Sequence, residues 1–217
     1  MTRRLLRWFF GIVAFATALA ISTTVTAATP DKRATILVVG DSISAAYGLP
    51  SGTGWVALLG KRLAEQHYAY DVVNASISGD TTAGGRARLP ALLAQHHPAI
   101  VVIELGGNDG LRGGDVAATR ANLDSMIDAA TKARAKVLLI GMKLPPNYGS
   151  AYTKRFDALY ADASRRHKTA LLPFFFEGFA DRNELFQSDR IHPTQAAQPL
   201  LLDNVWPVLK PLLAAKR

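Results

Sequence analysis

Five short runs of apolar residues, separated by stretches with helical periodicity, constrain the fold of this chain more than any other feature. The runs are nearly continuous in apolar residues, as expected for strands of a parallel sheet covered on both faces. They occupy residues 35–39 (TILVV), 71–75 (DVVNA), 100–105 (IVVIEL), 136–140 (KVLLI) and 170–172 (ALL). Between them, apolar residues recur at helical spacing, as at Leu58, Leu59 and Leu63. The alternation predicts a three-layer αβα sandwich around a five-stranded parallel sheet, with functional groups in the loops after the strands.

The first 27 residues have the pattern of a secretory signal peptide. Three arginines precede an apolar run over residues 8–21, and small residues follow up to an expected cleavage site near Ala27 or Ala28. An uncleaved membrane anchor is the alternative, but these 14 residues fall short of the roughly 20 that a spanning helix needs. We therefore expect a signal peptide over 1–27, a single domain over 28–217 and a periplasmic location, reached by either the general or the twin-arginine export route.

Charge and cysteine content exclude several classes of function. The formal charge of +8 comes from 25 Lys and Arg against 17 Asp and Glu. Without residues 1–27 the chain keeps 22 basic and 17 acidic residues, a net charge of +5, and its cations form no dense run, so we expect no nucleic-acid partner. The chain has no cysteine. A disulfide framework, a thiolate nucleophile, a cysteine-ligated metal and a lipid-anchored cysteine are therefore all excluded.

Polar residues with the chemistry of acyl transfer follow the expected strands. Ser42 comes directly after the first strand and is the candidate nucleophile, while Ser44 lies farther from the strand end and is a weaker one. Asp189 and His192 are three positions apart, a spacing that lets a carboxylate hold an imidazole whose other nitrogen faces the serine. Such a reaction also needs donors for an oxyanion. The candidates are the backbone N–H groups of Ser42 and Gly79 and the side-chain amide of Asn108.

Three aspartates near these groups are interpreted as structural. Asp41 is expected to support the turn that carries Ser42, and Asp80 and Asp109 to brace their loops. The remaining histidines are joined by no cysteine and no HExxH pattern, so we expect no metal site. The phenylalanine cluster 174–176 and the segment 144–146 (LPP) follow strands, and one of them is expected to wall an acyl groove.

Four blocks in this order resemble the SGNH (GDSL-type) hydrolase family. They are GDS at 40–42, SGD at 78–80, GGND at 106–109 and DRIHP at 189–193, and the resemblance spans roughly residues 36–212. It implies a flavodoxin-like sandwich in which Ser42 is the nucleophile, His192 the general base and Asp189 its partner. Ser42, Gly79 and Asn108 would then form the oxyanion hole. The resemblance also implies hydrolysis of acyl thioesters, aryl esters and lysophospholipids through a covalent acyl-enzyme, with no cofactor.

The chain departs from the family pattern at three positions. Ile43 replaces a leucine and Ala46 stands where glycine is common, changes that are expected to affect packing only slightly. Arg190 stands where glycine is common between the aspartate and the histidine. This arginine is expected to alter the loop backbone or to add a cation at the mouth of the site, and so to affect the choice of leaving group.

Two other functions are compatible with the sequence. A carbohydrate O-deacetylase on the same scaffold would prefer acetylated sugars to longer acyl esters. A non-catalytic periplasmic lipid or acyl carrier would use Ser42 only as a turn residue. For the favoured esterase, the partners are small-molecule substrates, with no stable membrane anchor, and the chain is expected to be a monomer.

Overall fold

A five-stranded parallel sheet lies at the centre of the computed structural model, which describes residues 33–214. The strands are β1 (Ala34–Gly40), β2 (Tyr70–Asn74), β3 (Ile100–Glu104), β4 (Lys136–Ile140) and β5 (Ala170–Leu172), in the spatial order β2-β1-β3-β4-β5. The expected fold class is confirmed, and no strand end differs from its predicted position by more than one residue. The signal peptide expected over residues 1–27 lies outside the described residues.

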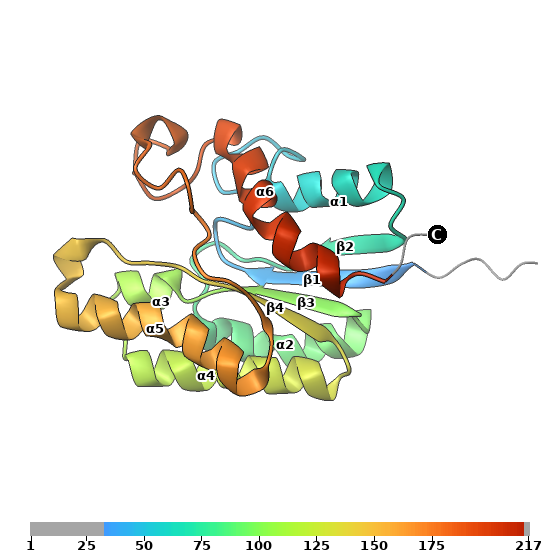
Figure 1. The fold of residues 1–217 in the computed structure, drawn as a ribbon, viewed down its shortest axis with the longest axis horizontal. Helices are drawn as coiled ribbons and strands as arrows, with labels where there is room; N and C mark the ends of the chain where they lie inside the picture. Colours follow the sequence, from blue (N-terminus) through green and yellow to red (C-terminus); the bar gives the residue numbers. More distant parts are fainter. Residues whose placement is uncertain (1–32, 215–217) are drawn as a thin grey trace, which may run out of the picture. The chain divides into compact units, whose positions relative to one another are not determined.

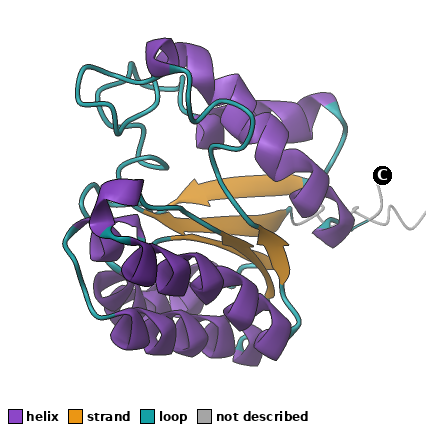
Figure 2. Cartoon of the chain, turned by 60° about the vertical axis from the view of Figure 1, so that its left-hand side comes forward, coloured by secondary structure: helices purple, strands orange, loops and turns teal. Residues whose placement is uncertain are grey.

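Helices cover both faces of the sheet (Figures 1 and 2). The helices α1 (Trp55–Glu65) and α6 (Gln198–Leu209) lie on one face, and α2 (Thr82–His96), α4 (Val116–Lys132) and α5 (Ser150–His167) lie on the other. Each turns an apolar stripe inward because apolar residues recur at helical spacing, as Trp55, Leu59 and Leu63 do in α1. No helix within residues 33–214 has the length and apolar character needed to cross a bilayer.

The last helical segment, expected over residues 194–213, is an α-helix with a 3₁₀ turn at each end. The 3₁₀ turn η3 (Gln195–Ala197) precedes α6, and the 3₁₀ turn η4 (Lys210–Leu212) follows it. Pro207 lies inside α6, which continues to Leu209, whereas Pro211 lies in the 3₁₀ turn. Of the two prolines expected to kink or divide this segment, only Pro211 coincides with a change of helix type.

The order of the strands creates a crevice between β1 and β3. The chain passes from β1 to β2 on one side and then returns to place β3 on the other side of β1. Loops that leave β1 and β3 diverge at this switch point, where ligands bind in open α/β sheets. Gly40 pairs in register with Glu104, so the residues after the two strands begin side by side.

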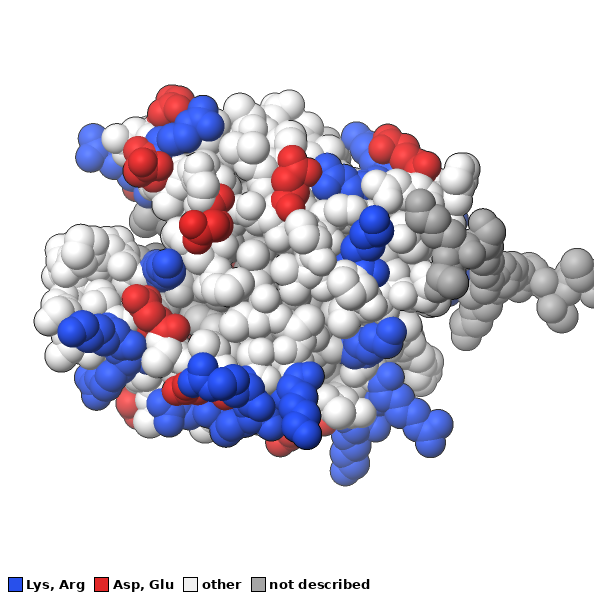
Figure 3. All heavy atoms as spheres, in the orientation of Figure 1, with Lys and Arg blue, Asp and Glu red and all other residues white. Residues whose placement is uncertain are grey.

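Charged side chains are mixed in sign on the face shown in Figure 3. Lys and Arg gather along the lower edge of that view, and Asp and Glu lie among them. Ion pairs join some of the charged side chains of the described residues, such as Arg166 with Asp124 at 2.7 Å.

Candidate active site

Ser42, His192 and Asp189 form a hydrogen-bonded line, although the first two are 150 positions apart in the chain. Ser42 Oγ lies 2.8 Å from His192 Nε2, and His192 Nδ1 lies 2.6 Å from Asp189 Oδ2. The imidazole therefore contacts the hydroxyl with one nitrogen and the carboxylate with the other. The spacing of three residues between Asp189 and His192 does bring their side chains to the same side of the turn.

The turn from Asp189 to His192 holds the carboxylate in place. The backbone N–H groups of Ile191 and His192 donate to Asp189 Oδ1 at 2.9 and 3.0 Å. Burial alone would raise the pKa of Asp189, but the hydrogen bonds from the His192 side chain and from these N–H groups outweigh burial and lower the pKa to about 2. The carboxylate is therefore ionised at neutral pH and available to orient the imidazole.

Two positions where the family commonly has glycine adopt left-handed backbone conformations. Arg190 has φ of +59° and Ala46 has φ of +58°. Because this region favours glycine, both residues carry backbone strain. The expectation that Ala46 affects packing only slightly is therefore incomplete, since the substitution also bears on the backbone.

The three expected oxyanion donors lie in three different loops. Within residues 33–214, no acceptor takes the backbone N–H of Ser42 or of Gly79. Gly79 has φ of +78°, a conformation that glycine adopts without strain. Arg112 donates to its carbonyl oxygen at 3.0 Å. Asn108 lies in the first turn of the short helix α3 (Gly107–Leu111) and, like Ser42, lines the pocket described below, whereas Gly79 is not among the lining residues.

A glycine at the end of β3 allows the close approach that sets the direction of α3. Gly106 has φ of +116°, and a Cβ atom there would lie 2.4 Å from the Tyr160 hydroxyl. That hydroxyl donates to the carbonyl oxygen of Leu105 at 3.1 Å. Only glycine fits both the backbone conformation and the space, so α3 can begin at once and carry Asn108 over the crevice.

Two buried carboxyl groups lie beneath Ser42. Asp41 Oδ1 accepts the N–H of Ile43 at 3.0 Å, which supports the turn as expected, and Asp41 Oδ2 accepts the Asn108 amide at 3.1 Å. Burial raises the pKa of Asp41 to about 6. Glu104 is fully buried, and burial together with the nearby Asp41 raises its pKa well above the usual range.

Ser44 belongs to this buried network and not to the pocket. Its hydroxyl donates to Glu104 Oε2 at 2.7 Å and accepts from Trp55 Nε1 at 3.2 Å. The side chain is almost completely buried. These contacts leave Ser42 as the serine that faces the pocket.

Asp80 and Asp109 brace loops as expected. Asp109 accepts the N–H and the hydroxyl of Thr82 at 2.9 and 2.5 Å. Asp80 accepts Arg88 Nε at 2.8 Å. Arg88 also donates to the carbonyl oxygens of Gly40 and Ala75 and thereby ties the ends of β1 and β2 together. The sequence gives no signal for this role, because Arg88 resembles any other cation of an amphipathic helix.

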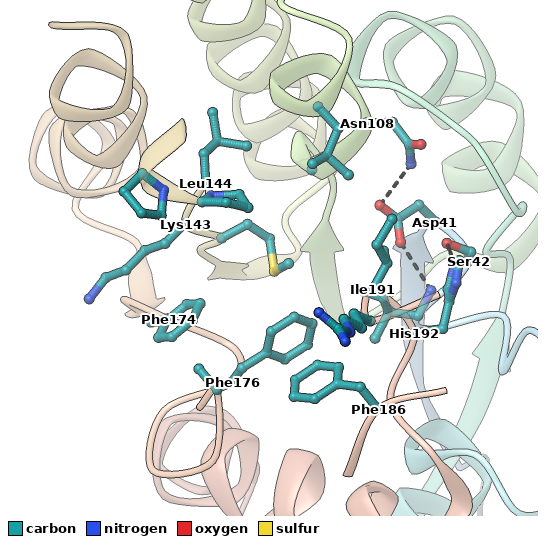
Figure 4. Close-up of a pocket in the computed structure, with 18 residues that line it drawn as sticks. Asp41, Ser42, Asn108, Lys143, Leu144, Phe174, Phe176, Phe186, Ile191 and His192 are labelled. Atoms are coloured by element: carbon teal, nitrogen blue, oxygen red, sulfur yellow. Dashed lines mark hydrogen bonds between the residues drawn. The ribbon is translucent and has the colours of Figure 1, made fainter. Parts of the chain in front are cut away.

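An apolar pocket of about 500 Å³ opens beside Ser42 and His192 (Figure 4). Both segments considered as walls of an acyl groove contribute to it. Its apolar walls include Leu144, Pro145, Pro146, Phe174, Phe176, Phe186 and Ile191. Lys143 and Arg190 are the cations among the lining residues. Phe175, between two wall residues, belongs to the core.

Tyr47 is a site residue that sequence reasoning missed. Its ring centroid lies 4.7 Å from that of His192, and Gln187 donates to its carbonyl oxygen at 2.8 Å. The side chain is 53% exposed. A large aromatic residue five positions after the candidate nucleophile is the only sequence signal for this contact.

The described part of the chain holds no group of three or more His, Asp or Glu residues that could bind a metal ion.

The fold, and the hydrogen-bonded Ser42, His192 and Asp189 beside an apolar pocket, define the class of protein. The chain is an α/β enzyme that hydrolyses ester bonds. The GDSL-like Lipase/Acylhydrolase family matches residues 38–199, most of the chain. The chain belongs to this family.

Known relatives agree with this membership. The chain is 62% identical to Esterase TesA of Pseudomonas aeruginosa, over 82% of the chain and 89% of that protein. It is 43% identical to thioesterase 1/protease 1/lysophospholipase L1 of Escherichia coli K12, over 82% of the chain and 85% of that protein. A crystal structure of TesA superimposes with a TM-score of 0.81 at 62% identity, covering 82% of this chain and 99% of the other.

Proposed function

We propose that this enzyme is a serine esterase and thioesterase in which Ser42 is the nucleophile, His192 the general base and Asp189 the residue that orients the imidazole. The observation that carries the proposal is the 2.8 Å contact between Ser42 Oγ and His192 Nε2 at the edge of the apolar pocket. At this distance the imidazole can take the hydroxyl proton as the oxygen attacks a carbonyl carbon.

The first half of the reaction forms an acyl-enzyme. Ser42 Oγ bonds to the carbonyl carbon, its proton moves to His192 Nε2, and the carbonyl oxygen becomes an oxyanion. The N–H groups of Ser42 and Gly79 and the Asn108 amide donate to that oxyanion. The carbon–oxygen or carbon–sulfur bond to the leaving group then breaks, and the leaving group takes the proton from His192.

The second half restores the enzyme. A water molecule gives a proton to His192 Nε2 and attacks the acyl carbon, and the ester bond to Ser42 Oγ breaks as the serine recovers that proton. Ionised Asp189 stabilises the imidazolium in both halves, because its pKa of about 2 keeps it negatively charged throughout the neutral range. The free acid leaves, and the mechanism requires no metal or organic cofactor.

The chemistry of the pocket supports acyl esters and thioesters with an apolar chain as substrates. Its apolar walls suit a fatty acyl group better than a sugar. Two cations line the pocket, Arg190 and Lys143, whose ammonium lies 4.8 Å from the centre of the Phe174 ring. They suit leaving groups with phosphate, such as coenzyme A or a lysophospholipid head group. The names of two relatives, an esterase and a thioesterase/lysophospholipase, support the same range.

A kinetic panel tests this proposal. We expect kcat/KM for p-nitrophenyl esters to rise from acetate to medium-chain acyl groups. Each methylene that the pocket buries is expected to stabilise the transition state by up to about 0.8 kcal/mol. Acyl-CoA and lysophospholipid of matched chain length are expected to be hydrolysed at the same site. Replacement of Ser42 or His192 by alanine is expected to lower kcat about 10⁴-fold or more on every substrate. A maximum at acetate, with acetylated sugars preferred, would indicate the O-deacetylase.

The non-catalytic carrier is disfavoured by membership of an ester-hydrolysing family. It predicts no turnover above that of the Ser42→Ala variant. Turnover that disappears with Ser42→Ala and His192→Ala contradicts it directly.

We also propose that the enzyme is exported to the periplasm and works there as a monomer. The signal-peptide pattern of residues 1–27 supports the export. Mass spectrometry of the exported protein is expected to give an N-terminus near residue 28. An exported protein that still begins at Met1 would contradict the cleavage.

A further inference from the structure

The two carboxylate oxygens of Asp41 have different partners. Oδ1 accepts the backbone N–H of Ile43 at 3.0 Å and so shapes the turn that carries Ser42. Oδ2 accepts the side-chain amide of Asn108 at 3.1 Å, across the crevice between β1 and β3 (Figure 4). Asp41 is only 2% exposed, so water competes little for either oxygen. One side chain thus connects the nucleophile turn to the helix that carries the oxyanion donor.

We propose that Asp41 is a positioning residue that fixes the orientation of the Asn108 amide, so that nitrogen and not oxygen faces the substrate's carbonyl oxygen. This inference rests on the proposed role of Asn108 as an oxyanion donor. The two ends of an asparagine amide have nearly the same shape, and hydrogen bonding decides between them. An ionised carboxylate only accepts, so it selects the Nδ2 end.

The Asn108 amide nitrogen can bond Asp41 and still donate to the oxyanion. Nδ2 carries two hydrogens. Asp41 takes one of them, and the other remains for the oxyanion. In the reversed orientation, Oδ1 of Asn108 would occupy the donor position, and its partial negative charge would repel the developing oxyanion.

Glu104 is placed to keep the negative charge on Asp41. It lies at the in-register end of β3, where its Oε2 accepts from the Ser44 hydroxyl at 2.7 Å and, at a long 3.4 Å, from the N–H of Asp41. Its other oxygen, Oε1, has no hydrogen-bond partner among the described residues. Two adjacent buried carboxyl groups cannot both be ionised at moderate cost. Burial and the nearby Asp41 raise the pKa of Glu104 well above its usual range, so a proton taken up by this pair favours the more deeply buried Glu104.

Asp41→Asn separates the two tasks of this residue. Asparagine can still accept the N–H of Ile43 through its oxygen, but its nitrogen then donates towards Asn108 and requires that amide to turn round. We expect kcat to fall about 10²- to 10³-fold, as for the loss of an oxyanion donor, with KM changed less than about 3-fold. Affinity for an alkyl boronic acid, a tetrahedral analogue, is expected to fall in parallel.

A double-mutant cycle with Asn108→Ala tests whether Asp41 acts through Asn108. Asn108→Ala alone is expected to lower kcat about 10²- to 10³-fold. If the proposal holds, Asp41→Asn changes kcat less than about 3-fold in the Asn108→Ala background. Losses that multiply would overturn it, as would wild-type kcat in Asp41→Asn. If Asn108→Ala has normal kcat, the proposed oxyanion role fails instead.

Two further variants keep the test decisive. Asp41→Ala serves if Asp41→Asn does not fold, as judged by thermal unfolding. Because alanine also removes the acceptor for the Ile43 N–H, part of its loss of kcat is expected to remain in the Asn108→Ala background, but that loss must be at least about 10-fold smaller than in the wild-type background; equal losses in both backgrounds would overturn the proposal. Asp109→Asn is the matched control, because the Asp109 carboxylate accepts from Thr82 and makes no hydrogen bond with the Asn108 amide among the described residues. Its effect on kcat, whatever its size, is expected to be equal in both backgrounds.

Discussion

Asp41 carries its negative charge in a buried site, and this lowers the stability of the fold at neutral and alkaline pH. Its pKa is raised to about 6 because burial disfavours the charged form. A carboxyl whose pKa is raised on folding stabilises the fold at acidic pH, and that contribution is lost as pH rises through the folded-state pKa. The shift from 3.8 to about 6 corresponds to roughly 3 kcal/mol.

We therefore expect Asp41→Asn to be more stable than the wild type at pH 8 by about 1–3 kcal/mol, while its kcat is far lower. Urea unfolding at pH 4.5 and pH 8 measures this difference. The wild type should lose more stability than the variant between the two pH values. Equal losses in both proteins would show that the Asp41 charge carries no such cost.

Arg190 combines backbone strain with a cation at the pocket. Its left-handed conformation costs about 1–2 kcal/mol for a residue with a Cβ atom. Glycine removes that strain at an entropic cost of about 0.5–1 kcal/mol. We expect Arg190→Gly to raise the free energy of unfolding by about 0.5–1 kcal/mol. We also expect it to lower kcat/KM for acyl-CoA, relative to a p-nitrophenyl ester of the same chain, about 3- to 10-fold.

Arg134 provides the matched control for this substitution. It is an exposed arginine with φ of +64° that lies just before β4. It is therefore at the amino ends of the parallel strands, whereas Ser42 follows the carboxyl end of β1. Arg134→Gly is expected to give a similar gain in stability with an unchanged substrate ratio. A ratio that moves equally in both variants would remove Arg190 from leaving-group recognition.

At the scale of elements, Arg88 of α2 joins two loops of the site. It pairs with Asp80 at 2.8 Å, and both side chains are largely buried. We expect Arg88→Met to lower the free energy of unfolding by about 3 kcal/mol, because Asp80 is left without its partner. We also expect kcat to fall about 10-fold or more as the Gly79 loop shifts. Urea unfolding and steady-state kinetics measure the two effects.

Exposed Arg86, two residues earlier in the same helix, serves as the control. Arg86→Met is expected to change stability by less than about 0.5 kcal/mol and to leave kcat unaltered. Equal effects of the two substitutions would mean that Arg88 acts only as a surface cation.

The elements were predictable from the sequence to different degrees. Strands β3 and β4 follow from their apolar runs, because a strand buried on both faces leaves little room for other residues. The helix α3 was not predicted, since five residues rich in glycine carry no helical periodicity. It follows Gly106, where the backbone conformation and the close approach of the Tyr160 hydroxyl both require glycine.

The buried hydrogen-bond network beneath Ser42 could not be predicted from the sequence either, because its members lie far apart along the chain. A glutamate at the end of an apolar run, as in IVVIEL, signals a buried carboxyl group, but its partner Ser44 lies 60 positions away. The residue types and their order predicted the candidate nucleophile, base and carboxylate. Which atoms meet depends on strand register and on loop conformation, and these emerge only in the folded chain.

At the scale of the whole molecule, one chain supplies every group of the candidate site. Ser42, Asn108 and His192 come from blocks spread over most of the sequence, and the switch point between β1 and β3 gathers them. We therefore expect specific activity to stay constant on dilution to nanomolar concentration, with a monomer in sedimentation velocity experiments. Activity lost on dilution and restored by added protein would show that a second copy completes the site.

The most direct test of the central claim is the site at which a fluorophosphonate reacts. Such a probe bonds covalently to a serine oxygen that an adjacent base has activated. We expect one probe per chain, mapped by peptide mass spectrometry to Ser42, with simultaneous loss of hydrolysis of p-nitrophenyl esters and acyl-CoA. Ser42→Ala is expected to remain unlabelled. Labelling at another residue, or an unlabelled wild-type enzyme that still turns over substrate, would contradict the assignment of Ser42 as the nucleophile.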